Sequence, residues 1–138
     1  MTKEDLYNFI VKHRLGVLGS ISPDGLPQGA LVGIAVTRDL EIIFDTVSSS
    51  RKYSNLVRNP RASLVLGWEG EVTLQYEGDA SEPKGGELAR CQEVYFAVWP
   101  ECRSHLSWPK VAYFVVAPKW IRYSDYDQNP PQIEEFNF

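Results

Sequence analysis

The middle of the chain holds a group of cations that no acidic residue interrupts. Between Thr46 and Trp68 there is no Asp or Glu, although the whole protein has 18 acidic and 14 basic residues and a formal net charge of -4. The cations of this stretch are Arg51, Lys52, Arg58 and Arg61. Cations grouped in this way attract an anion such as a phosphate.

Three serines, Ser48 to Ser50, stand directly before Arg51. Ser49 or Ser50 can cap a short helix over residues 51–58, which ends at Asn59-Pro60. The start of a helix offers free backbone N–H groups and the positive end of the helix dipole, and both favour a bound phosphate. The residue types alone leave two interpretations open: a phosphate site, or a solvated basic helix face with a serine cap.

The elements around this segment are mostly strands. Apolar periodicity and turn residues predict helices over residues 3–13, 51–58 and 87–99, and strands over 16–22, 28–37, 41–46, 61–68, 72–80, 111–117 and 120–123. The first three strands read as an antiparallel meander with no helix between them, which excludes a parallel start to the sheet. Clustered strands with peripheral helices predict a mainly β fold, a closed antiparallel barrel.

The length of 138 residues fits a single domain, which we expect over residues 1–126. Residues 127–138 form an acidic tail with Pro130-Pro131, which we expect to be irregular or extended. Because the tail ends on aromatic residues, it has a reason to dock on the barrel or on a partner, although a frayed terminus is the alternative.

Several classes of protein are excluded by composition. No apolar stretch is long enough to span a membrane, no secretion signal precedes the first helix, and the net negative charge argues against nucleic-acid binding. Two cysteines are too few for a disulfide scaffold, so we expect a cytoplasmic protein with reduced thiols. His13 and His105 have no further ligand at metal-binding spacing, so the sequence predicts no metal site.

The basic segment resembles a known family motif. The run Phe44-Asp45-Thr46, then Ser50-Arg51-Lys52 and the closing Asn59-Pro60, is similar to the FMN-phosphate segment of the pyridoxamine 5'-phosphate oxidase-like split-barrel family. The element order from Leu6 to Tyr123 is also similar to that family. The resemblance implies a Greek-key-like antiparallel split β-barrel of six to seven strands, with FMN as the cofactor.

The resemblance also implies which residues bind the cofactor. Arg51 and Lys52 match the phosphate-binding pair, Ser50 matches the hydroxyl before them, and Thr46 matches a residue that contacts the flavin. Four consecutive residues match the segment whose backbone runs along the isoalloxazine ring: Ala30, Leu31, Val32 and Gly33. Thr73 lies where the oxidases have a cofactor-binding glutamine, and its shorter side chain is a departure from the pattern.

The family implies a homodimer with FMN at the interface and an FMN-dependent oxidoreductase that acts on a small molecule. No side chain is an evident general acid or base, so no catalytic residue is assigned. The alternatives are a flavin-binding, storage or sensing protein without turnover, and a haem or deazaflavin binder on the same barrel. True pyridoxamine phosphate oxidases are longer, and Trp120 and Arg122 cannot be matched to their substrate-binding Trp and Arg.

Overall fold

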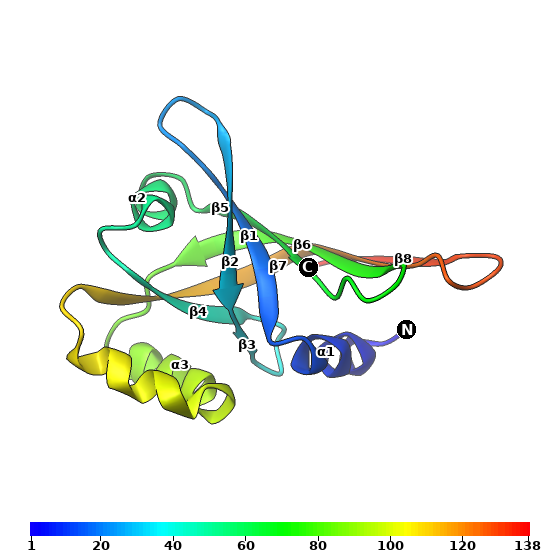
Figure 1. The fold of residues 1–138 in the computed structure, drawn as a ribbon. Helices are drawn as coiled ribbons and strands as arrows, with labels where there is room; N and C mark the ends of the chain where they lie inside the picture. The colour runs from blue at the N-terminus through cyan, green and yellow to red at the C-terminus, as the bar shows by residue number, and fades with distance from the viewer.

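The computed structural model describes residues 1–138, and its strands pair in antiparallel fashion throughout (Figure 1). The helices are α1 (Lys3–Lys12), α2 (Arg51–Arg58), α3 (Gly85–Val98) and the 3-10 helix η1 (Pro100–Ser107). The strands are β1 (Leu15–Ile21), β2 (Pro27–Gly33), β3 (Ala35–Val36), β4 (Ile42–Val47), β5 (Arg61–Leu66), β6 (Val72–Ser81), β7 (Val111–Asp125) and β8 (Gln132–Asn137).

The strands form one curled sheet with peripheral helices, which confirms the mainly β split barrel. Its strand order is β2-β1-β5-β6-β7-β4-β3, and β8 pairs with β7 off this path. Seven strands follow this path, and β8, which lies in the predicted tail, is an eighth. None of the helices is long and apolar enough to cross a membrane.

The predicted strand over residues 28–37 is two strands, so the predicted three-strand meander is wrong. β2 pairs with β1 as far as Gly33, whereas Ala35 pairs with Ile43 of β4. Between them, the Ile34 amide donates to the Arg14 carbonyl over 2.9 Å. The chain therefore leaves one side of the barrel at Ile34 and joins the other side.

The two predicted late strands are one long strand, β7. Pro118 lies opposite Gly78 of β6, where the register shifts. A β-carbon on Gly78 would collide with the Ala117 carbonyl, so the glycine permits the close approach of the two backbones. A proline at such an irregularity does not break the strand, because the regular ladder is already interrupted there.

The C-terminal tail is ordered rather than irregular. Residues 132–137 form β8, which pairs with Trp120–Asp125 of β7. Phe136 stands opposite Ile121 and packs against the main core. This pairing holds the tail against the barrel, as we expected from the aromatic residues at its end.

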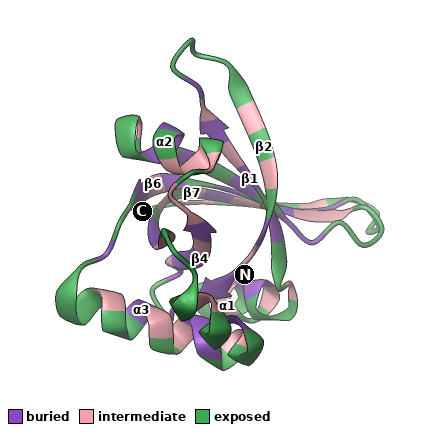
Figure 2. Ribbon diagram, turned by 60° about the vertical axis from the view of Figure 1, so that its left-hand side comes forward, coloured by how far each residue is buried: buried purple, intermediate pink, exposed green.

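Two apolar cores hold these elements together. The larger one fills the barrel and includes the fully buried Phe44, Tyr76 and Phe114. The smaller one lies between α3 and the sheet and includes Cys91, Tyr95 and Tyr113, among others. Figure 2 shows the contrast with β2, which is exposed or half-buried over nearly all its length.

Candidate functional site

The start of α2 is held by hydroxyl contacts. Ser50 is the N-cap, and its Oγ accepts a hydrogen bond from the Tyr53 amide at 3.2 Å. The same Oγ lies 2.9 Å from the Thr46 hydroxyl at the end of β4. The first turn of α2 is therefore fixed to the strand before it, and it contains no acidic residue.

A buried amide attaches the middle of α2 to two strands. Asn55 Nδ2 donates to Ser20 Oγ of β1 at 3.1 Å and to Gln28 Oε1 of β2 at 2.9 Å. Because Asn55 is only 2 % exposed, these bonds are shielded from water. The helix that carries Arg51 and Lys52 is thus held in register with β2.

The two cations border a small concavity of about 140 Å³. Its lining is Ser20, Gln28, Gly29, Ala30, Arg51 and Lys52, with no acidic residue among them. Neither Arg51 nor Lys52 makes an ion pair or a side-chain hydrogen bond within the protein. Two unpaired cations and a helix N-terminus therefore face the backbone of β2, an arrangement suited to an anion with a flat group attached.

Two glycines of β2 have different reasons for lacking a side chain. A β-carbon on Gly29 would meet only Val17 Cγ1, at 3.9 Å, so a side chain at this position would extend into open space. A β-carbon on Gly33 would lie 2.9 Å from Trp99 Cζ2. Gly33 therefore makes room for the Trp99 ring, whose Nε1 donates to the Ile34 carbonyl.

The structure brings together only part of the predicted set. Ala30, Arg51 and Lys52 line the concavity, while Ser50 and Thr46 stand behind it at the helix start.

Other predicted residues do not line the concavity. Leu31 is 62 % exposed and Val32 is buried. Thr73 lies on β6, in the middle of the strand order, opposite Ser124 of β7, and lines no part of the concavity. Ser20 and Gln28 were not predicted, since nothing in a strand sequence marks a residue that faces a distant helix.

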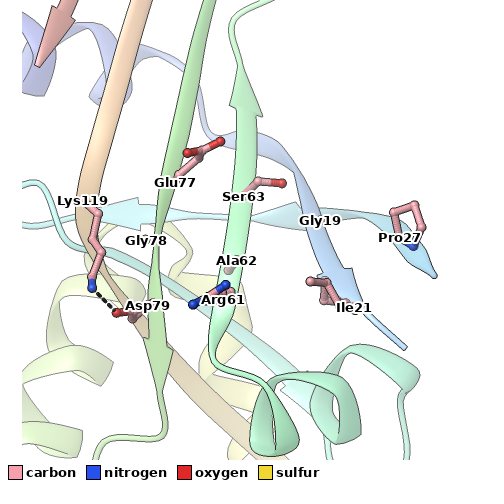
Figure 3. A pocket seen from close by; sticks show the side chains of 11 residues that line it. Gly19, Ile21, Pro27, Arg61, Ala62, Ser63, Glu77, Gly78, Asp79 and Lys119 are labelled. Atoms are coloured by element: carbon pink, nitrogen blue, oxygen red, sulfur yellow. Dashed lines mark ion pairs between the residues drawn. The ribbon is translucent and has the colours of Figure 1, made fainter. Parts of the chain in front are cut away.

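A larger concavity of about 510 Å³ adjoins the first, and Ser20 lines both. Figure 3 shows it across β1, β5, β6 and β7, with Arg61, Glu77 and Asp79 among its lining residues. Lys119 pairs with Asp79 at 2.9 Å. Because it contains both charge signs, this concavity is less suited to a phosphate than the one at Arg51 and Lys52.

A second polar cluster lies away from this surface, at the smaller core. Asp45, Cys102 and His105 bring their possible metal-binding atoms within 4.8 Å of one another. His105 Nδ1 lies 2.7 Å from Asp45 Oδ2, and Tyr95 donates its hydroxyl to Asp45 Oδ1 at 3.2 Å. The sequence analysis did not anticipate this grouping, although Cys102 and His105 stand three positions apart. Asp45 reaches them from β4, which only the fold reveals.

The surroundings of this cluster keep its hydroxyl and thiol groups protonated. Burial first, and then the charge of Asp45, raise the pKa of Cys102 and of Tyr95. The same two causes, with a smaller effect of Cys102, raise the pKa of Tyr113 to about 12. The Tyr113 hydroxyl is buried and has no hydrogen-bond partner among the protein atoms.

The antiparallel strands and peripheral helices define a split β-barrel protein. The family described as Pyridoxamine 5'-phosphate oxidase has a sequence model that matches residues 2–125. The chain belongs to this family.

A curated relative is the pyridoxine/pyridoxamine 5'-phosphate oxidase of Bacteroides fragilis, which is 34% identical over 85 residues. The match covers 61% of this chain and 34% of the relative, so the chain aligns with about a third of that enzyme's length. The activity of the whole relative is therefore not transferred to this chain by the match.

Solved structures support the fold. A heme binding protein from Mycobacterium smegmatis superposes with a TM-score of 0.85 at 16% identity, covering 98% of this chain and 57% of that one. A pyridoxamine 5'-phosphate oxidase-related, FMN binding protein from Nostoc punctiforme PCC 73102 has a TM-score of 0.67 at 13% identity, covering 91% and 87%. At these identities the likeness concerns the fold alone.

Proposed function

We propose that this protein binds FMN, with the phosphate held by Arg51 and Lys52. The observation that carries the proposal is the concavity where these two unpaired cations face the backbone of Gly29 and Ala30. The family membership supports the choice of FMN over another phosphate. The phosphate would accept from the guanidinium, the ammonium and the free amides of the first turn of α2.

The remaining residues fit the cofactor in supporting roles. Ser50 and Thr46 fix the helix start, and Ser50 is the nearest hydroxyl in sequence to the two cations. Ala30 to Gly33 would lie along the flat ring system, whose approach is eased by the bare backbone at Gly29. Thr73 would contribute only from a second copy of the chain, since it is remote from the concavity within one copy.

We further propose that the protein is an FMN-dependent oxidoreductase of a small molecule. FMN supplies hydride and electron transfer when bound, so the protein needs only to position it and to admit a substrate. The larger concavity that adjoins Ser20 offers space for that substrate. Binding or sensing of flavin without turnover is the alternative, and bleaching of the flavin absorption by NAD(P)H separates the two.

The functional unit would be a homodimer. Leu31, Val17 and Val65 stand opposite one another on three adjacent strands, β2, β1 and β5. All three are exposed, by 62%, 41% and 37%. A row of apolar side chains across a sheet face is suited to burial against a second copy.

A haem binder on the same barrel is the second candidate, and the likeness to the Mycobacterium smegmatis protein favours it. The chain has two histidines as possible axial ligands, and Nδ1 of each is engaged, 2.8 Å from the Phe9 carbonyl for His13 and 2.7 Å from Asp45 Oδ2 for His105, which leaves Nε2 of either ring to bind iron. The absorption spectrum of the purified protein distinguishes the candidates, because haem gives a Soret band and flavin gives two broad bands in the near-ultraviolet and blue.

The decisive experiment replaces both cations, Arg51→Ala together with Lys52→Ala. Two charge-assisted hydrogen bonds of about 1.5–3 kcal/mol each are lost, so FMN affinity should fall at least about 100-fold. Riboflavin, which has no phosphate, should bind the variant and the wild type alike. Fluorescence titration measures both affinities.

The matched control is Lys3→Ala with Arg38→Ala, which removes the same charge far from α2. Each of these cations is paired with a surface acid. The control variant should bind FMN with an affinity within about twofold of the wild-type value, because salt screens exposed charges at a distance. Unchanged FMN affinity in the Arg51 and Lys52 double variant would show that the phosphate binds elsewhere.

A further inference from the structure

Asp45, Cys102 and His105 are three side chains of the types that bind zinc, and they come from two elements. Asp45 is on β4, whereas Cys102 and His105 are on successive turns of η1. Their candidate donor atoms lie between 2.7 and 4.8 Å apart. In a tetrahedral zinc site with bonds of about 2.0–2.3 Å, ligand atoms are about 3.3–3.7 Å apart. Adjustments of about 1 Å would therefore bring the three around one ion.

The cluster is already built in the manner of a metal site. Tyr95 donates to Asp45 Oδ1, which leaves Oδ2 directed at His105. The His105 ring stacks on Trp108 with 3.7 Å between centroids, which fixes its plane. Outer contacts of this kind orient ligands and are a regular feature of metal centres.

An independent observation also points to a ligand at this place. Tyr113 stands directly opposite Asp45 in the β4–β7 pair, so the two side chains share one face of the sheet. Tyr113 is 4% exposed, and its hydroxyl has no partner in the protein. A buried hydroxyl without a hydrogen bond is costly, and a group bound at the cluster would provide the missing acceptor.

We propose that Asp45, Cys102 and His105 bind a divalent transition-metal ion, with zinc as the expected metal. A mixed set of carboxylate, thiolate and imidazole suits zinc better than the all-oxygen preference of magnesium or calcium. On binding, the ion displaces the Nδ1 proton of His105, so that the neutral ring carries its one proton on Nε2, and the Cys102 thiol proton passes to solvent. A water molecule completes the tetrahedron and accepts the hydrogen bond of Tyr113.

The first test uses Co²⁺ as a coloured substitute for zinc on protein stripped with a chelator. The wild type should take up about one equivalent and show a thiolate-to-cobalt charge-transfer band in the near ultraviolet. Zn²⁺ should abolish this band by displacement. Cys102→Ala should lose the band, and His105→Ala should weaken affinity by at least about tenfold.

The chain supplies matched controls, since it has one further cysteine and one further histidine. Cys91→Ala alters the same apolar core as Cys102, and His13→Ala removes an imidazole at the end of α1. Both controls should bind Co²⁺ like the wild type. Absence of the band in the wild type, or an equal loss in Cys91→Ala, would overturn the proposal.

A second measurement avoids variants that fail to fold. Zn²⁺ should slow the alkylation of Cys102 in the wild type by at least about tenfold, as read from peptide masses, and leave Cys91 unchanged. Equal alkylation of Cys102 with and without zinc would mean that the cluster is only a hydrogen-bonded group of the core.

Discussion

The side-chain amide of Asn55 donates to Oε1 of Gln28 over 2.9 Å, and so joins the middle of α2 to the edge strand β2. The two cations at the start of α2 and the backbone of Gly29 and Ala30 belong to these same two elements. The spacing between the proposed phosphate site and the proposed ring site therefore depends on one buried amide.

Replacing Asn55 should affect FMN binding without removing any group that touches the phosphate. Asn55→Ala loses one buried and one partly buried hydrogen bond, which should lower the free energy of unfolding by about 1–3 kcal/mol. FMN affinity should fall more than riboflavin affinity, because only FMN uses both the start of the helix and β2, whose relative position is loosened. Calorimetry and fluorescence titration measure the two effects. An equal loss of affinity for FMN and riboflavin would contradict this role.

The exposed row on β2, β1 and β5 gives a prediction for assembly. Leu31→Glu should raise the dimer dissociation constant by more than about tenfold, because a charge would be buried against the partner. Leu26→Glu is the control: Leu26 is 59% exposed but lies in the turn before β2, outside the row. Light scattering over a dilution series measures both variants. A wild type that is monomeric at micromolar concentration would refute the dimer.

The tail contributes to stability through one of its aromatic residues. Phe136→Ala should lower the free energy of unfolding by about 1–3 kcal/mol, since this side chain packs against the main core. Phe138→Ala should have an effect below about 0.5 kcal/mol, because Phe138 is 54% exposed. Thermal unfolding compares the stability of the two variants. Removal of residues 127–138 should lower stability at least as much as Phe136→Ala. Equal melting temperatures for the two alanine variants would contradict it.

Replacing two buried tyrosines by phenylalanine should have different effects on the free energy of unfolding. Tyr76 donates its hydroxyl to the carbonyls of Leu40 and Val116, each at 2.8 Å, so Tyr76→Phe should cost about 1–2 kcal/mol. The Tyr113 hydroxyl has no partner, so Tyr113→Phe should be neutral or stabilising in metal-free protein. Denaturant unfolding with chelator present measures both. A comparable loss of stability in Tyr113→Phe would show that its hydroxyl has a partner after all.

Structural features that depend on neighbouring residues in the sequence were predicted most reliably. The bounds of α2 follow from neighbouring residues and are as predicted, and of the two serines predicted as possible caps the structure has Ser50. The prediction that Pro118 separates two strands was wrong, because Pro118 is accommodated opposite the bulge at Gly78. Pro130-Pro131 directly precede β8, in line with the extended tail that was one of the two expectations.

Relations across the sheet could not be predicted. Asp45 and His105 are separated by 60 residues, and their contact requires η1 to fold back over β4. Gln28 faces Asn55 only because β2 lies beside α2. No periodicity in the sequence encodes such neighbours, so Ala30, Arg51 and Lys52 were predicted for the concavity, whereas Ser20, Gln28 and the whole group of Asp45, Cys102 and His105 were not.

The pairing of β8 with β7 leaves β8 as an outer strand of the sheet. Glu134 and Glu135 are adjacent on it, so a carboxylate points to each of its two faces. Glu134 already pairs with the N-terminal ammonium and Glu135 with Arg122, so a second chain adding to this strand would break these ion pairs or place acid beside acid. This edge is therefore a poor template for fibril growth, in contrast to the apolar row of Leu31, Val17 and Val65 proposed as the dimer surface.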